Sequence, residues 1–93
     1  AIFCCNDLMA MGAVNACQRM GRRVPQDISV IGYDNTALSR YTAPKLTTID
    51  QNMGDLGREA ARLMLKQIEE NVTENVVLAN TVVERETTGF RVG

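Results

Sequence analysis

Two short pairs of polar residues carry the most promising chemistry in this sequence. Asn6-Asp7 and Asp34-Asn35 each follow a run of apolar residues. A carboxylate accepts hydrogen bonds from two hydroxyl groups, and an amide both donates and accepts, as a sugar hydroxyl does. These groups together suit an uncharged, polyhydroxylated small molecule. We therefore expect Asn6 and Asp34 to bind such a ligand, with Asp7 and Asn35 close to it.

The same side chains also have purely structural explanations. Asn6 or Asp7 could cap a helix that begins here, by accepting hydrogen bonds from its free amides. Asp34 could simply be a turn residue that ends a strand. Acid–base work by two carboxylates is conceivable, but the position of Asp7 favours capping over a free acid. The sequence predicts no catalytic residue.

Metal and cofactor chemistry has little support in these residues. The chain contains no histidine and no Cys-x-x-Cys motif, which excludes a His-containing zinc site and a His-based triad within it. It also lacks a glycine-rich phosphate loop, which argues against an α/β enzyme. Cys4, Cys5 and Cys17 lie in apolar surroundings and fit reduced thiols, so we expect a cytoplasmic protein without metal or cofactor.

Composition narrows the class of protein further. The 93 residues are 45% hydrophobic and 23% charged, with a net charge of −1, which is ordinary for one small globular domain. No apolar stretch approaches the roughly 20 residues that span a bilayer. The basic residues are scattered apart from Arg22-Arg23, so this segment is not expected to bind DNA directly. Because Ala1 opens an apolar run, we interpret the chain as part of a longer protein.

The first half of the chain has the pattern of a βαβ unit. Residues 2–5 and 28–33 are predicted strands, apolar on both faces, and residues 8–20 form a predicted helix that Gly21 ends. Ligands bind beyond the carboxyl ends of parallel strands, and both polar pairs would meet at that edge. The apolar stripe of the helix is expected to comprise Met9, Ala13, Ala16, Cys17 and Met20.

The second half predicts one short strand, a helix and a return segment. Residues 46–49 form a strand-like run, and Asn52 is expected to cap the next helix with Asp55 three residues on. Residues 76–78 and 81–85 are short strand candidates, the latter suited to a sheet edge. The predicted apolar stripe of the second helix comprises Leu56, Ala60, Leu63, Met64 and Ile68.

Three ordered motifs resemble one known family. They are AIFCCNDLMAMGA at residues 1–13, VPQDISVIGYDN at residues 24–35, and LTTI at residues 46–49. Their order and spacing resemble the LacI/GalR family of bacterial transcription regulators, although Asn35 stands where that family usually has a second Asp. The resemblance extends over nearly the whole chain, except the last ten or so residues.

The resemblance implies a fold and a function. The fold would be α/β, a Rossmann-like three-layer α/β/α sandwich with a parallel sheet, forming part of a two-lobed periplasmic-binding-protein-like type I domain. The effector would lie between the lobes, in contact with Asn6 and Asp34, and the Asn before Asp7 favours a sugar over a nucleobase. Operator DNA would be bound only by a helix-turn-helix upstream of this sequence. The alternative is a periplasmic sugar-binding protein of a transport system, which free thiols disfavour.

The resemblance also divides the chain into three parts. Residues 1–50 would be the βαβ unit of the C-terminal lobe, and residues 51–72 a helix that packs on the absent N-terminal lobe. Residues 73–93 would be a return segment with an edge strand. The family dimerises through this lobe, and part of the first helix is apolar outside its sheet-facing stripe. The expected homodimer contacts are Leu8, Met11, Leu38 and Tyr41, unless another part of the same lobe covers them.

Overall fold

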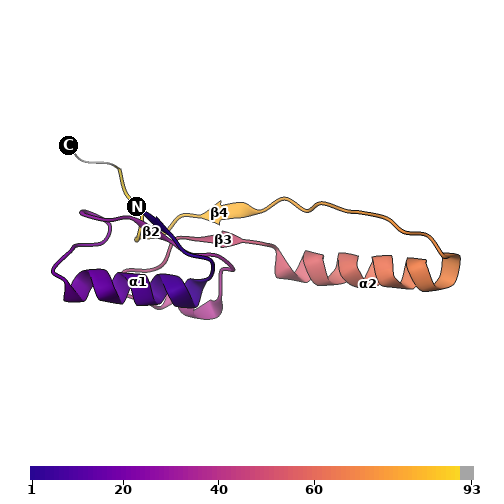
Figure 1. Cartoon of the computed structure of the whole chain (residues 1–93), viewed down its shortest axis with the longest axis horizontal. Helices are drawn as coiled ribbons and strands as arrows, with labels where there is room; N and C mark the ends of the chain where they lie inside the picture. Colours follow the sequence, from indigo (N-terminus) through magenta and orange to yellow (C-terminus); the bar gives the residue numbers. More distant parts are fainter. Residues whose placement is uncertain (91–93) are drawn as a thin grey trace.

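The computed structural model describes residues 1–90, which form a small α/β unit with a helical arm (Figure 1). The last three residues of the predicted return segment 73–93 lie outside the described residues. No helix in the described part of the chain is long and apolar enough to cross a membrane. The elements in chain order are β1 (Ile2–Phe3), α1 (Asp7–Arg19), β2 (Val30–Ile31), the 3-10 helix η1 (Ala37–Arg40), β3 (Thr48–Asp50), α2 (Met53–Glu70) and β4 (Thr81–Val83).

The predicted βαβ unit is confirmed. β1 and β2 pair in parallel, with Phe3 opposite Ile31, and α1 connects them. Ile31 also forms a parallel bridge with Thr47, just before β3, and β3 then pairs antiparallel with β4. Of the two strand candidates in the return segment, only the one around residues 81–83 forms a strand.

The expected sheet-facing stripe of α1 is wrong in most of its members. Met9 and Met20 are 58% and 77% exposed, whereas Ala10 and Val14 are buried together with Cys17. The buried residues of α1 are still spaced as on one helix face, but this face differs from the predicted one. Small side chains allow a helix to approach a sheet closely, and this requirement outweighs the larger hydrophobicity of methionine.

The end of α1 follows the prediction. Gly21 adopts the left-handed conformation with φ of 77°. The amide of Arg22 donates to the carbonyl of Cys17 at 2.8 Å, and that of Gly21 donates to Gln18 at 3.1 Å. These bonds satisfy carbonyl groups that the helix itself leaves open, so the chain turns sharply toward β2.

One face of the sheet is open in the described residues. α1 packs on the other face, where Cys4, Val30 and Leu46 join its buried residues in the core. In β1, Ile2 and Phe3 are 38% and 64% exposed, although the sequence predicts strands buried on both sides. α1 therefore supplies one of the two helical layers of the predicted sandwich.

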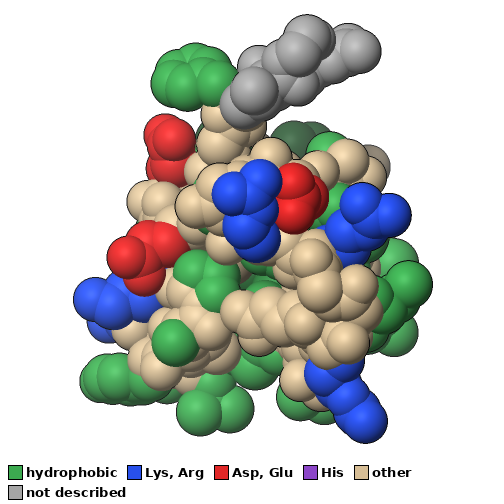
Figure 2. Space-filling view, turned by 90° about the vertical axis from the view of Figure 1, so that its left-hand side faces the viewer, with side chains coloured by type: hydrophobic (Ala, Val, Ile, Leu, Met, Phe, Trp, Pro, Cys, Tyr) green, Lys and Arg blue, Asp and Glu red, His purple; other side chains and the backbone are tan. Residues whose placement is uncertain are grey.

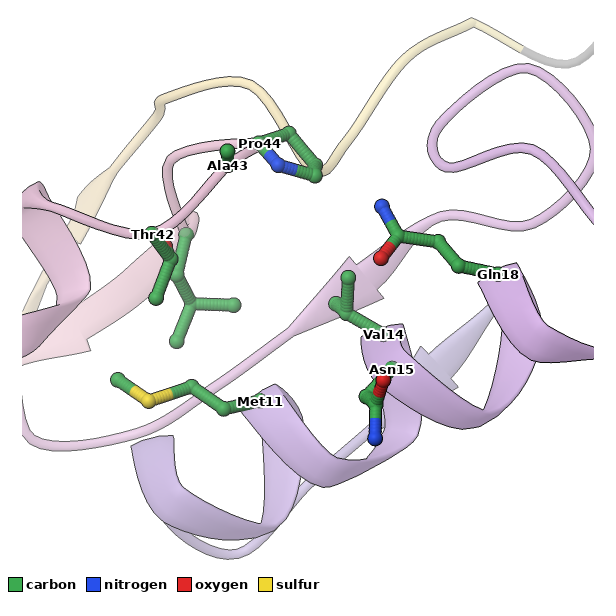
Figure 3. A pocket seen from close by; sticks show the side chains of 8 residues that line it. Met11, Val14, Asn15, Gln18, Thr42, Ala43 and Pro44 are labelled. Atoms are coloured by element: carbon green, nitrogen blue, oxygen red, sulfur yellow. The ribbon is translucent and has the colours of Figure 1, made fainter.

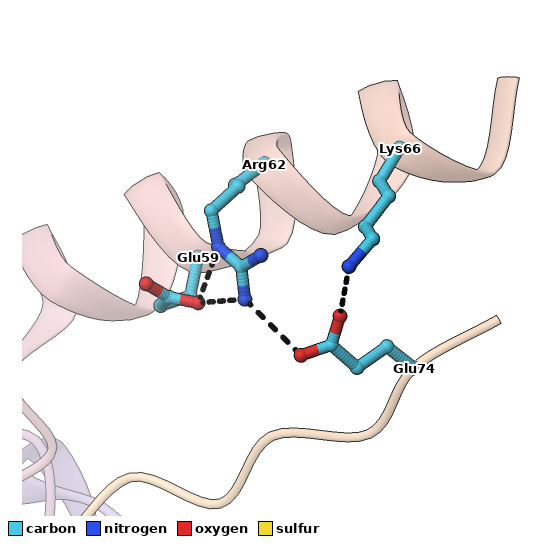
Figure 4. Close-up of polar contacts among 4 residues, drawn as sticks. All are labelled: Glu59, Arg62, Lys66 and Glu74. Atoms are coloured by element: carbon cyan, nitrogen blue, oxygen red, sulfur yellow. Dashed lines mark hydrogen bonds and ion pairs between the residues drawn. The ribbon is translucent and has the colours of Figure 1, made fainter. Parts of the chain in front are cut away.

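α2 extends away from the sheet and has no buried residue (Figure 1). Asn52 occupies the predicted capping position, but its side chain accepts no hydrogen bond from the helix backbone. Its backbone is left-handed, with φ of 59°, and its side-chain Nδ2 instead donates to the carboxylate of Asp55 at 2.7 Å. Along α2, Arg62 bonds Glu59, and Lys66 bonds Glu74 of the return segment (Figure 4).

Candidate functional site

The two polar pairs meet at one edge of the sheet. Phe3 lies opposite Ile31 in the parallel pair, so the chain reaches Asn6 and Asp34 after the same number of residues beyond each strand. A direct hydrogen bond joins the two tips, because the amide of Thr36 donates to the carboxylate of Asp7 at 2.7 Å. The juxtaposition on which the predicted site depends is therefore present.

Asn6 is the capping residue of α1. Its Oδ1 accepts a hydrogen bond from the amide of Met9 at 2.8 Å, and its backbone is extended, as is typical of this position. The side chain is half-buried, and its NH2 group bonds no other residue among residues 1–90. Capping fixes the orientation of this side chain while its two amide hydrogens stay available to a ligand.

Asp7 has a different role from its neighbour. Its side chain is only 1% exposed and does not cap the helix, although it was one of the two capping candidates. Both oxygens are engaged: Oδ1 accepts from the hydroxyl of Thr48 at 2.6 Å, and Oδ2 accepts from the amide and hydroxyl of Thr36. Asp7 thus joins α1, the turn after β2 and the start of β3.

Gly32 makes room for this carboxylate. A Cβ atom at position 32 would lie 2.5 Å from Oδ1 of Asp7 and 3.0 Å from a methyl carbon of Leu46. Neither neighbour can move freely, since Asp7 is held by Thr36 and Thr48 and Leu46 is buried in the core. The glycine in the second motif therefore serves the close approach of backbone and carboxylate.

Asp34 stands at the edge in an unusual backbone conformation. Its φ is 119°, and its amide donates to the carbonyl of Ile49 at 2.9 Å. The side chain is half-buried, and its Oδ1 accepts a hydrogen bond from the amide group of Gln51. The other carboxylate oxygen bonds no residue in the described part of the chain, so it can accept from a ligand hydroxyl.

Asn35 is tied into the protein rather than directed to solvent. It also has a positive φ, 54°, and its Nδ2 donates to Asp50 at 3.3 Å. Its Oδ1 accepts from the guanidinium of Arg85 at 2.6 Å, and its amide donates to the hydroxyl of Thr48 at 3.2 Å. Asn35 therefore supports the turn that carries Asp34.

Four residues at this edge were not predicted from the sequence. They are Thr36, Thr48, Gln51 and Arg85. Gln51 had a usable signal, because it follows the strand-like run 46–49 and so lies at the same edge. The other three depend on pairing between distant segments, which residue spacing does not reveal.

The edge is an open surface rather than an enclosed pocket. Four cavities of about 180 to 530 Å³ lie elsewhere among residues 1–90, and none of these is lined by Asn6 or Asp34. If these residues bind a ligand, as predicted, the polar groups of the two tips would form one wall of its site. A ligand held there needs a second wall to exclude water from its hydroxyl groups.

A groove of about 180 Å³ lies on another side of the molecule, between α1 and the loop after η1. Figure 3 shows Met11 and Val14 of α1 on one side of the groove and Thr42 and Pro44 on the other. Exposed apolar side chains occur on the same part of the chain: Leu8 of α1, Leu38 of η1 and Tyr41 after η1 are 74%, 62% and 81% exposed. Met11 itself is half-buried and packs against the core.

Charge and thiol chemistry near these surfaces are modest. Figure 2 shows one end of the molecule, where Lys and Arg side chains are interspersed with Asp and Glu and form no basic patch. Burial, and next to it the neighbouring Cys5, raises the pKa of the Cys4 thiol. Cys4 therefore stays protonated at neutral pH and serves as a core residue. No group of His, Cys, Asp and Glu in the described residues could hold a metal ion.

Comparison with known proteins identifies the domain class. Residues 1–88 match the family of periplasmic binding protein-like domains. The chain is 50% identical over 78 residues to the HTH-type transcriptional repressor PurR of Pasteurella multocida, which covers 84% of the chain and 23% of that protein. It is 46% identical over 89 residues to the ribose operon repressor of Haemophilus influenzae, covering 92% of the chain and 26% of that protein.

Solved structures agree with these relatives. The dimeric Lac repressor with an 11-residue C-terminal deletion matches with a TM-score of 0.83 and 41% identity, over 92% of this chain and 32% of that one. A LacI family regulator from Enterococcus faecium with bound ribose matches with a TM-score of 0.81 and 38% identity, over 92% of this chain and 33% of that one.

The chain belongs to the periplasmic binding protein-like domain family. Within it, the chain is a part of the effector domain of a LacI-family transcriptional regulator, as its motifs predict. It spans about a quarter of the length of the curated relatives that it matches.

Proposed function

We propose that this chain forms one wall of a sugar-effector site, and one dimerisation surface, in a cytoplasmic LacI-family repressor. The observation that supports the proposal is that Asn6 and Asp34 follow neighbouring parallel strands at the same sheet edge, where Thr36 bonds Asp7. Asn6 has free donors and Asp34 has a free acceptor, which matches the mixed character of sugar hydroxyls. Sugar-bound neighbours support this effector class: one is a ribose complex and one a cellobiose complex.

The proposed mechanism is a shift between two arrangements of the lobes. The open edge carries half of the site, and the second lobe would close over it when the effector binds. Effector binding would then favour one lobe arrangement and change operator affinity through the dimer. Operator DNA would be contacted by an upstream helix-turn-helix, as befits a relative of the HTH-type transcriptional repressor PurR.

The effector assignment is tested with Asp34→Ala in the full-length regulator. We expect binding of D-ribose, cellobiose or another sugar to fall by roughly a hundredfold or more, because a charge-assisted acceptor is lost from the site. Operator binding should stay intact. Isothermal titration calorimetry measures the first, and a fluorescence anisotropy assay with operator DNA the second.

Asp27→Ala is the matched control for this substitution. Asp27 precedes β2, is exposed, and bonds Arg23 rather than the proposed site. It should leave effector affinity unchanged. Unchanged sugar affinity in Asp34→Ala would refute the assignment of Asp34, and binding of hypoxanthine but of no sugar would refute the effector class.

The dimer surface is proposed to include Leu8, Met11, Leu38 and Tyr41. Leu8 of α1, Leu38 of η1 and Tyr41 just after η1 are exposed, and Met11 lines the groove between α1 and the loop after η1. A carboxylate introduced at Met11 would be buried without a partner in the dimer. We therefore expect Met11→Asp to give monomers in sedimentation velocity. Met20→Asp, also on the α1 segment but exposed at its far end, should remain dimeric; a dimer in both variants would exclude this surface.

Transport binding is the alternative function for this fold. The buried thiols of Cys4 and Cys17 and the exposed thiol of Cys5 suit a reducing compartment better than the periplasm. The names of the relatives also favour the repressor. The sequence upstream of Ala1 discriminates the two: a helix-turn-helix supports the regulator, and an export signal supports the transporter.

A further inference from the structure

The guanidinium of Arg85 makes three hydrogen bonds near the proposed effector site, as many as the carboxylate of Asp7. It donates to Oδ1 of Asn35 at 2.6 Å, to the hydroxyl of Ser39 at 2.8 Å and to the carbonyl of Leu46 at 2.9 Å. Its backbone amide donates to the hydroxyl of Thr47 at 2.9 Å. Arg85 therefore links the segment after β4 to the turn after β2 and to the start of β3.

The turn at residues 34–36 is held from two sides by opposite charges. Arg85 bonds Asn35 from the C-terminal segment, and the Asp7 carboxylate bonds Thr36 from the start of α1. Ser39 connects the two, because its hydroxyl accepts from Arg85 and donates to the carbonyl of Thr36 at 2.6 Å. Asp7 and Arg85 form no ion pair with each other. The turn at residues 34–36 lies between them and is bonded to both.

This turn needs external support. Asp34 and Asn35 both have positive φ, 119° and 54°, a conformation that side chains with a Cβ atom adopt only when their surroundings hold them there. Arg85 is the cation that bonds the side chain of Asn35, and charge-assisted hydrogen bonds are the stronger ones. Without it, the turn loses a main restraint on the direction of the adjacent Asp34 carboxylate.

We propose that Arg85 is a positioning residue for effector binding, which sets the Asp34–Asn35 turn and acts through Asn35 rather than by touching the effector. Two of its guanidinium nitrogens are already occupied by protein acceptors. This inference rests on the proposed effector site at Asn6 and Asp34. It predicts that the loss of Arg85 weakens effector binding through the geometry of the turn.

The test uses the full-length regulator with D-ribose as the probe. Arg85→Gln should weaken ribose binding, measured by calorimetry, by roughly ten- to a hundredfold. Its operator affinity without ribose should change by less than about threefold. Arg62→Gln is the matched control, because Arg62 bonds Glu59 on α2 and has no contact with the turn. It should leave ribose affinity unchanged.

A double-mutant cycle separates positioning from general stabilisation. If Arg85 acts through Asn35, then Asn35→Ala should also weaken ribose binding, and the double variant should bind no worse than the weaker single variant within about threefold. Full additivity of the two losses would overturn the proposed route. Asn35→Ala leaves the bonds of Arg85 to Ser39 and Leu46 in place, so it tests the proposal even if Arg85→Gln fails to fold.

Hydrogen exchange gives a readout that needs no effector. The amides of Asp34, Asn35 and Thr36 all donate within the protein. In Arg85→Gln, peptides spanning residues 33–41 should exchange faster while those of α1 stay protected. Unchanged exchange together with unchanged ribose affinity would overturn the role of Arg85. Failure of the wild-type protein to bind ribose, cellobiose or any other sugar tested would count against the proposed effector class instead.

Discussion

The sheet edge that carries Asn6 and Asp34 differs from the helix α2 in how its polar and apolar side chains are placed. Every buried apolar residue among residues 1–90 lies between Cys4 and Leu46, whereas α2 has none. At the edge, the buried Asp7 carboxylate has all its partners within the protein. Along α2, large apolar side chains such as Ile68 are 71% exposed, and the bonds join charges at the surface.

This difference indicates that the sheet edge holds one conformation through its own contacts, whereas α2 does not. Buried, fully bonded polar groups cannot be lost without leaving partners unsatisfied, so they fix one conformation of the edge. Exposed ion pairs contribute little and leave several arrangements open. The apolar stripe of α2 makes sense only against another surface, and the predicted N-terminal lobe would supply it.

The largest effect should follow from breaking the edge at Asp7. Asp7→Ala leaves the Thr36 amide and two hydroxyl groups without their acceptor, so we expect about 3 kcal/mol loss of unfolding free energy in the 93-residue chain. Urea unfolding followed by circular dichroism measures it. Asp55→Ala on α2 is the control and should change the midpoint little, since Asp55 bonds only neighbours on the surface. Equal midpoints for the two variants would contradict the comparison.

A smaller loss of unfolding free energy is expected when a valine is truncated to alanine in the core, and almost none when this is done in the exposed return segment. Val14 of α1 is 7% exposed and part of the core, while Val77 of the return segment is 96% exposed. Val14→Ala should cost about 1 to 2 kcal/mol through lost burial and the cavity left behind. Val77→Ala should stay within about 0.5 kcal/mol of the parent chain in the same urea experiment. A comparable loss at Val77 would mean that the arm packs on the sheet in solution.

Local signals explain which parts of the fold were predictable. The first helix was expected at residues 8–20 and spans Asp7–Arg19, and the second was expected within residues 51–72 and spans Met53–Glu70. Apolar periodicity and the glycine stop at Gly21 act over a few residues, so sequence alone reveals them. The burial of Ala10 instead of Met9 depends on how closely the helix approaches the sheet, which is a property of the tertiary packing.

The candidate site divides in the same way. Asn6 and Asp34 could be placed at one edge because parallel strands end on the same side of a sheet. The hydrogen bonds that hold them were out of reach: Asp7 and Thr36 are 29 residues apart, and Asn35 and Arg85 are 50 residues apart. Such long-range side-chain pairing leaves no periodic pattern in a single sequence. Whether Asn6 and Asp34 bind an effector stays a prediction.

The smallest expected effect concerns the ion cluster that links α2 to the return segment. Glu74 accepts from Lys66 at 2.9 Å and lies 3.7 Å from Arg62 (Figure 4). The hydrogen bond from Lys66, and then its charge, hold the pKa of Glu74 below its ordinary value of 4.5. Because the folded-state pKa is the lower one, the cluster stabilises the arm above about pH 4.5, and this contribution is lost as the pH falls through the lowered pKa.

An NMR titration of the Glu74 side-chain carboxyl carbon checks this contribution directly. In the parent chain the midpoint should lie below 4.5, and in Lys66→Met it should move up toward that value. Added salt at about 0.5 M should act in the same direction, because exposed charges are screened over a few ångströms. A midpoint that responds to neither change would mean that the bond from Lys66 does not hold the Glu74 carboxylate in solution.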